Sequence, residues 1–141
     1  MTLIELNRKI QTIGESNAMI KTTFFGSLAD RMAQGDIDYP IFCFDLVSAP
    51  LTDKIETLNY EFWFLDRMRQ DRSNEEDALS DMIAVSNDVV AALTDVSLDI
   101  SLNKSITRTR IQDESPDVVC GVKLDIALYQ PINYNRCQIP T

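Results

Sequence analysis

Two segments of the chain repeat apolar residues at the spacing of an amphipathic helix. In residues 3–13 aliphatic side chains recur every three or four positions, and Thr2 followed by Glu5 has the spacing of a capping box. Gly14 is the expected C-cap of this helix. The second and longer segment covers residues 74–94. We therefore expect two main helices.

The start of the second helix carries its own signals. Ser73 followed by Glu76 repeats the capping-box spacing, and the acidic run at 75–77 suits the positive end of a helix dipole. The apolar stripe then continues to Leu93, with Ser86 as its one interruption. This is the clearest helical pattern in the sequence.

Alternation with a period of two predicts the strands. In residues 58–65 every second residue is apolar, whereas the other face is mixed and carries Trp63. A tryptophan on a mixed face suggests a second contact there, from a helix or a neighbouring subunit. Shorter strands are expected at 18–25 and at 41–47, with a short helical turn at 27–33 between them.

The C-terminal third changes from the helical period to the strand period. Residues 97–111 alternate apolar and polar side chains, and residues 118–129 do so without a break. The sequence QDESPD between them favours a turn. These segments should pair as a long antiparallel hairpin.

The order of elements predicts the class α+β. We expect a mainly antiparallel sheet of about five strands with two main helices packed on it and a long C-terminal β-hairpin. The 141 residues suit one domain, covering 1–129, followed by an irregular C-terminal tail at 130–141. The N-terminus mixes charge with aliphatic residues, so no signal peptide is expected.

Charge argues against tight binding to nucleic acid. Thirteen basic residues are scattered among 22 acidic ones, giving a net charge of −9. A protein that grips phosphates needs clustered Lys and Arg. An acidic surface would instead let DNA slide past, because like charges repel.

Common catalytic and cofactor sites are also argued against. The chain has no histidine, which removes the commonest general base and metal ligand. None of the four glycines belongs to a phosphate-binding loop. Cys43 and Cys120 lie in apolar strand patterns and should be buried, whereas Cys137 should be accessible; the three lack the spacing of metal ligands. We expect no enzyme activity, cofactor or metal.

Two groups of carboxylates leave alternatives open. Glu75, Glu76, Asp77 and Asp81 have the chemistry to bind a hard cation or to act on a sugar, but a solvated helix N-terminus explains them more simply. The acids beside Pro116 suit a hairpin turn.

Two groups of arginines are candidates for contacts. Arg67, Arg69 and Arg72 alternate with acids before the second helix, which suits local ion pairs or an interface better than a phosphate site. Arg108 and Arg110 share one side of a strand. Our hypothesis is that they face the acidic helix start across a subunit boundary.

Four segments together resemble one family of phage proteins. YPIFCFDLVSAPL (39–51), LNYEFWFLDRM (58–68), EEDALSDMIAVSNDVVAAL (75–93) and the closing VVCGVKLDIALYQPIN are similar, in order and local sequence, to the tail terminator or tail-completion proteins of tailed phages. The sequences of these segments also resemble ring or neck proteins of phages that infect Bacteroidetes, including the crAss-like group.

The resemblance implies a non-enzymatic virion protein at the head-to-tail junction. Such proteins form rings of six or twelve copies that contact portal or connector and tail proteins and leave a channel for the genome. The implied partners are copies of the chain, those neighbours and DNA that passes without specific binding, with no membrane; assembly would take place in the bacterial cytoplasm. The alternative is a soluble protein-binding module or inhibitor.

The candidate interface residues lie in exposed loops, on the mixed strand face and in the hairpin. They are Pro50, Leu51, Asp53, Lys54, Trp63, Arg67, Arg69, Arg72, Arg108, Arg110, Asp113 and Glu114.

Overall fold

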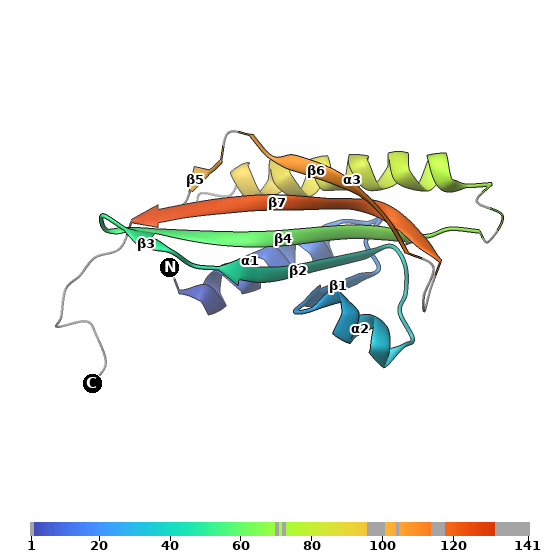
Figure 1. Cartoon of the computed structure of the whole chain (residues 1–141), viewed down its shortest axis with the longest axis horizontal. Helices are drawn as coiled ribbons and strands as arrows, with labels where there is room; N and C mark the ends of the chain where they lie inside the picture. The colour runs from blue at the N-terminus through green and yellow to red at the C-terminus, as the bar shows by residue number, and fades with distance from the viewer. Residues whose placement is uncertain are drawn as a thin grey trace.

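In the residues that the structure describes, the protein is an α+β domain with one mixed sheet of seven strands and three helices (Figure 1). The computed structural model describes residues 2–69, 71, 73–95, 101–103, 105–113 and 118–131. The helices are α1 (Leu3–Ser16), α2 (Leu28–Gln34) and α3 (Glu75–Asp95). The strands are β1 (Thr22–Phe25), β2 (Ile41–Ser48), β3 (Leu51–Thr52), β4 (Ile55–Arg67), β5 (Ser101–Leu102), β6 (Thr107–Asp113) and β7 (Val119–Pro131).

Two long antiparallel strands, β4 and β7, form the centre of the sheet. They pair without a register shift from Ile55 opposite Pro131 to Arg67 opposite Val119. Strand β2 lies on the other side of β4 and β1 lies beyond it, whereas β5 and β6 both pair with the far side of β7. At about 3.3 Å per residue the central strands span roughly 40 Å.

The sheet is mixed, so the expectation of a mainly antiparallel sheet of about five strands is corrected in detail. β1 runs parallel to β2, because α2 carries the chain back to the same end of the sheet before β2 begins. β1 is also shorter than the predicted strand 18–25. Residues before Thr22 turn instead, with the Ile20 N–H donating to the Asn17 carbonyl.

The main core lies between one face of the sheet and the two longer helices. Alternate residues of the central strands point to this face, including the four apolar residues expected on one side of 58–65. Phe42 and Phe64 stack with ring centroids 4.6 Å apart, and Phe62 meets Phe42 edge-on at 5.2 Å. Leu6 and Ile10 of α1 and residues of α3 pack onto these rings. The predicted amphipathic faces therefore meet the predicted apolar strand face.

Helix α1 continues past its predicted C-cap. Gly14 lies inside the helix, where a Cβ atom would come within 2.7 Å of Thr23 and 2.8 Å of Phe42. The glycine serves a close approach between helix and sheet, and Asn17 is the C-cap.

Helix α3 matches its predicted extent to within one residue. It begins at Glu75, and the Ala78 N–H donates to the Asn74 carbonyl. Ser86 does not interrupt the buried face: its side chain is fully buried and donates to the Ile83 carbonyl at 2.7 Å.

The C-terminal hairpin is present in a modified form. β5 and β6 both pair antiparallel with β7, so the segment predicted as one strand at 97–111 contributes two. Residues 97–100 and 104 of that prediction lie outside the described residues. β7 continues through Gln130 and Pro131, two residues into the predicted tail; residues 132–141 lie outside the described part.

Candidate protein interface

The second face of the sheet is largely open. α1 and α3 lie on the same side of the sheet; in the described part of the chain, the other side is covered at one end, by Met32 of the seven-residue α2 and by Ile37 in the loop after it (Figure 1). Trp63 belongs to this open face, at the end nearer α2, where it helps to line a hollow of about 310 Å³ together with Leu28. We treat the open face as the candidate site.

A row of three carboxylates crosses the middle of the open face. Asp45 of β2 is opposite Glu61 of β4, and Glu61 is opposite Asp125 of β7. Like charges placed directly opposite each other across strands destabilise a sheet. The row therefore carries an electrostatic cost within the isolated chain.

Lys123 offsets part of this charge. Its Nζ lies 3.2 Å from a Glu61 carboxylate oxygen and 3.6 Å from Asp125, and 5.3 Å from the centre of the Trp63 ring. The hydrogen bond to Glu61 is the main reason that the pKa of Lys123 is raised above its usual value. One cation thus stands among three anions.

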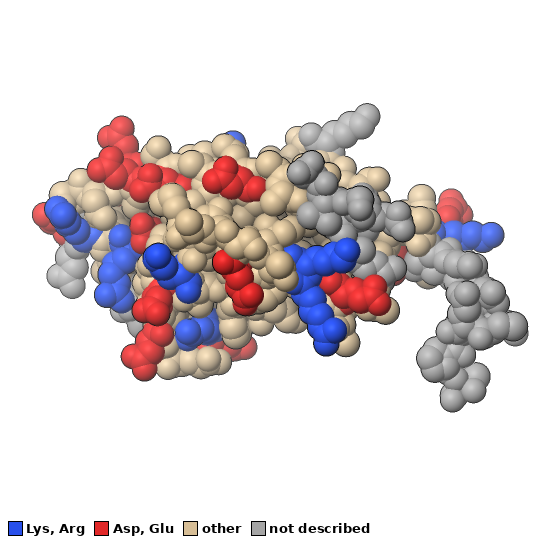
Figure 2. Space-filling model, turned by 180° about the vertical axis from the view of Figure 1, so that it is seen from behind, with Lys and Arg blue, Asp and Glu red and all other residues tan. Residues whose placement is uncertain are grey.

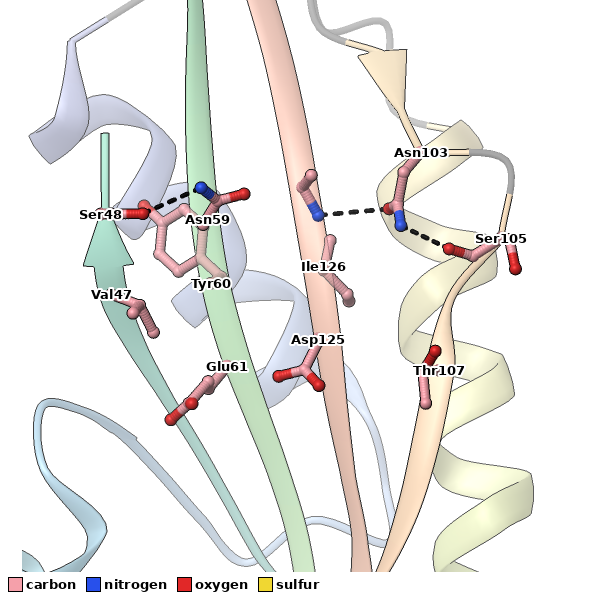
Figure 3. A pocket seen from close by; sticks show the side chains of 11 residues that line it. Val47, Ser48, Asn59, Tyr60, Glu61, Asn103, Ser105, Thr107, Asp125 and Ile126 are labelled. Carbon is pink, nitrogen blue, oxygen red and sulfur yellow. Dashed lines mark hydrogen bonds between the residues drawn. The ribbon is translucent and has the colours of Figure 1, made fainter. Parts of the chain in front are cut away.

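Beside the row the face is hollowed (Figure 3). The hollow has a volume of about 450 Å³ and is lined by both polar and apolar groups from β2, β4, β7, the start of β6 and the segment before it; the apolar ones include Val47 and Ile126. Glu61 and Asp125 project side by side on its floor. Asn103 fixes one wall: its backbone N–H donates to the Ala127 carbonyl at 3.1 Å, and its Oδ1 accepts from the Ala127 N–H at 3.2 Å.

Exposed apolar side chains gather at the end of the strands away from α2. Val47 is 60% exposed, Ile55 is 47% exposed and Tyr129 is 37% exposed. The β3–β4 turn lies at this end because Ile55 pairs with Pro131. Exposed apolar groups that are bordered by polar residues are typical of interaction sites.

The predicted loop at 50–54 is a tight hairpin turn at this same end. Asp53 and Lys54 take positive φ values of 48° and 65°, which a two-residue hairpin turn requires. Pro50, Leu51, Asp53 and Lys54 are all exposed. The structure thus places these four candidates at one tip of the molecule.

The arginine-rich turn lies at the opposite end of β4. The Arg67 guanidinium lies 5.3 Å from the centre of the Tyr39 ring, and the Arg69 backbone N–H donates to the Asn74 side chain at 2.7 Å. Arg72 lies outside the described residues. The candidates predicted in loops are therefore split between two ends of a long sheet and do not form one patch.

The contact predicted for the strand arginines is formed within a single chain, which corrects the hypothesis that it crosses a subunit boundary. Arg110 forms an ion pair with Glu75 at the start of α3. Arg108 donates a hydrogen bond to the side chain of Asn87, which lies further along the same helix. The reason is the topology: β6 pairs with β7 directly above α3. Asp113 ends β6, and Glu114 lies outside the described residues.

The cysteine thiols of the described residues are buried and do not reach the surface of the open face. Burial, with a smaller contribution from Asp45, raises the pKa of the Cys43 thiol to about 12, and burial also raises the pKa of Cys120. Both cysteines are buried as predicted, whereas Cys137 lies outside the described part. Among the described residues no three His, Cys, Asp or Glu side chains are grouped to hold a metal ion.

The helix-bearing face carries charges of both signs. Figure 2 shows acidic and basic side chains interspersed there on a largely uncharged surface.

No helix in the described part of the chain is long and apolar enough to span a membrane.

The row of Asp45, Glu61 and Asp125 was not among the residues that the sequence pattern predicted as interface candidates. Each residue occupied a polar position of an alternating strand, which was a visible signal. Their alignment depends on the register of three strands, and the register was set only by the assembled sheet.

No protein-family model matches the chain, and no curated protein matches it with significance.

Proposed function

We propose that this chain is a structural virion protein that assembles into a ring at the head-to-tail junction of a tailed phage. In this role it joins the portal or connector to the tail, leaves a channel for the genome and performs no catalysis. The observation that supports an assembly role most directly is the open sheet face, with its charged row and exposed apolar edge.

An open face of this kind favours assembly for an energetic reason. A sheet is most stable when both of its faces are covered. Here one face leaves Val47, Ile55 and Tyr129 exposed to solvent beside three aligned carboxylates. A partner that covers the apolar groups and pairs the carboxylates removes both costs. The face is thus better suited to a complex than to an isolated monomer.

The shape supports a role between two neighbours. The exposed hairpin turn at Asp53 and Lys54 and the turn containing Arg67 and Arg69 lie at opposite ends of strands roughly 40 Å long. A subunit with contact loops at both ends suits a ring stacked between two other assemblies. The net charge of −9 suits a channel wall that repels DNA phosphates.

The ring and the phage partners come from the resemblance of four sequence segments to tail terminator proteins. The rival function is a soluble protein-binding module or inhibitor, which would use the same open face. The two differ in where the chain is found when infection is complete.

Mass spectrometry of purified virions tests the proposal. The chain should be present at a constant ratio to the portal protein, and it should stay with the particles through density-gradient purification. Its absence from mature particles, with free chain in the lysate, would rule out the structural role and favour the binding module.

A matched pair of variants links that result to the open face. Glu61→Lys should abolish incorporation into virions, because it reverses the central charge of the row. Asp88→Lys makes the same charge change at an exposed position in the interior of α3 and should leave incorporation intact. Equal incorporation of both variants would separate the open face from assembly.

A further inference from the structure

Strand β6 is an unprotected edge of the sheet. Figure 1 shows it along the upper edge, with α3 behind it. Seven residues, Thr107–Asp113, pair with β7 in unbroken register, and no other strand of the described chain pairs with their far side. The segment contains no proline and its register has no bulge. Natural proteins normally block such edges, because they template pairing with another chain.

The other edge of the sheet is protected. β1 has only four residues, and the Gln11 side chain of α1 donates to the outward Thr23 carbonyl at 3.0 Å. Among the described residues, one edge of the sheet is therefore blocked and the longer one has no paired strand.

The directions of the backbone groups of β6 follow from its neighbour. Ala127 of β7 exchanges hydrogen bonds with Asn103, so it faces the β5–β6 side. Alternate residues of a strand face the same side. The β6 residues opposite positions 125, 123 and 121 therefore bond to β7, and those between them direct their N–H and C=O groups outward. The outward residues are Arg108, Arg110 and Gln112.

The side chains beside this edge define what it would accept. Arg108 and Arg110 lie on the α3 side, and Arg110 remains 55% exposed despite its ion pair with Glu75. Between α3 and β6 lies a hollow of about 320 Å³. Its lining is mainly apolar, from Val90, Ala91, Ile106 and Leu124, with Asn87 and Arg108 at the polar side.

We propose that β6 accepts an added strand from a different protein, with carboxylates at alternate positions and one apolar side chain that enters the hollow beside Ile106. In this mode backbone hydrogen bonds supply affinity and the pockets for alternate side chains supply specificity. The arginines select the acidic residues.

A second copy of this chain is a poor occupant of the edge. Antiparallel pairing of two β6 strands over their full length places Arg110 opposite itself, and like charges facing across strands are destabilising. Charge complementarity thus points to an acidic segment from another protein. The proposal stands without the head-to-tail role, because it concerns only this edge.

The test uses a peptide as the probe. The acetylated, amidated peptide Thr-Glu-Thr-Glu-Thr-Leu-Thr is titrated into the ¹⁵N-labelled chain, and the control peptide has both Glu replaced by Lys. The acidic peptide should shift the amides of Arg108, Arg110 and Gln112 and bind at least about tenfold more tightly than the control. Absence of binding at millimolar peptide, or shifts confined to the open face, would overturn the proposal.

Two substitutions at one position separate the backbone from the side chain. Arg110→Pro removes an outward N–H that β7 does not use, which an edge strand tolerates. Arg110→Ala removes the same side chain and keeps the N–H. The two variants should unfold at thermal midpoints within a few degrees of each other. The proline variant should bind the peptide about tenfold more weakly than the alanine variant.

Equal binding by the two variants would contradict strand addition. If Arg110→Pro does not fold, Gln112→Pro against Gln112→Ala makes the same comparison near the end of the strand. Hydrogen exchange of the free chain adds a check: the three outward amides should exchange fast, and their protection in the monomer would mean that the edge is already occupied.

Discussion

Single residues decide where the helices and strands approach closely. A Cβ atom at Gly121 would lie 1.8 Å from the Phe64 carbonyl oxygen, so any side chain there would force the two central strands apart. Gly14 plays the same part between α1 and the sheet. Both positions require a small residue for space and not for an unusual backbone conformation.

Gly121→Ala should therefore destabilise the protein strongly. We expect a loss of about 3 kcal/mol or more in the free energy of unfolding, since the obstruction is backbone and cannot rotate away. Urea unfolding measures it. Gly35→Ala is the comparison, because Gly35 has open space but a φ of 72° and a ψ of −173°, so its loss of about 1–3 kcal/mol comes from backbone strain alone. A loss at Gly121 below about 1 kcal/mol would show that β4 and β7 are not packed this closely.

A second residue-scale prediction concerns Asp66. Burial is the main cause of its raised pKa, and the neighbouring Asp81 raises it further. A carboxyl group whose pKa is higher in the folded state favours folding when protonated, so this contribution is present at low pH and is lost as pH rises through the raised pKa.

Asp66→Asn should consequently be more stable than the wild type at pH 7, and the difference should disappear below the ordinary pKa of aspartate. The Arg67 N–H that donates to Asp66 can still donate to the amide oxygen. Thermal unfolding from pH 3 to pH 8 checks this. A variant that is less stable than the wild type at neutral pH would show that the charge is favourable where it stands.

At the scale of elements, the carboxylate row connects three strands and is the most direct mark of an interface. Asp45→Asn removes one of the three charges and keeps the acceptor for the Leu46 N–H at 3.0 Å. The isolated chain should gain about 0.2–1 kcal/mol, and the gain should shrink as salt is added. Asp88→Asn, at an exposed position of α3, serves as the control. A loss of stability at Asp45 would mean that the row is not repulsive.

Elements with strong periodicity were predictable from the sequence. Which elements pair or pack with one another was not. The pattern at 58–65 identified the buried face of β4, and the pattern at 74–94 identified α3 almost residue by residue. The parallel pairing of β1 was not predictable, because it depends on where α2 returns the chain. Likewise the intrachain contact between Arg110 and Glu75 follows from three-dimensional neighbours that alternation alone does not specify.

On the scale of the whole molecule, two surfaces are left unpartnered for different reasons. The open face carries acids and exposed apolar groups, whereas the β6 edge carries arginines and free backbone groups. Two surfaces of opposite charge on one domain suit a subunit that contacts two different neighbours. The loops at the two ends of the central strands would add contacts above and below the ring that we propose.

A cryo-EM map of the neck of the phage tests the central claim most directly. The account predicts a closed ring between portal and tail into which this fold fits, with Glu61 and Tyr129 of the open face buried against a neighbouring subunit and a continuous channel at the centre. A neck without this fold, or a ring in which the open face points into bulk solvent, would contradict it.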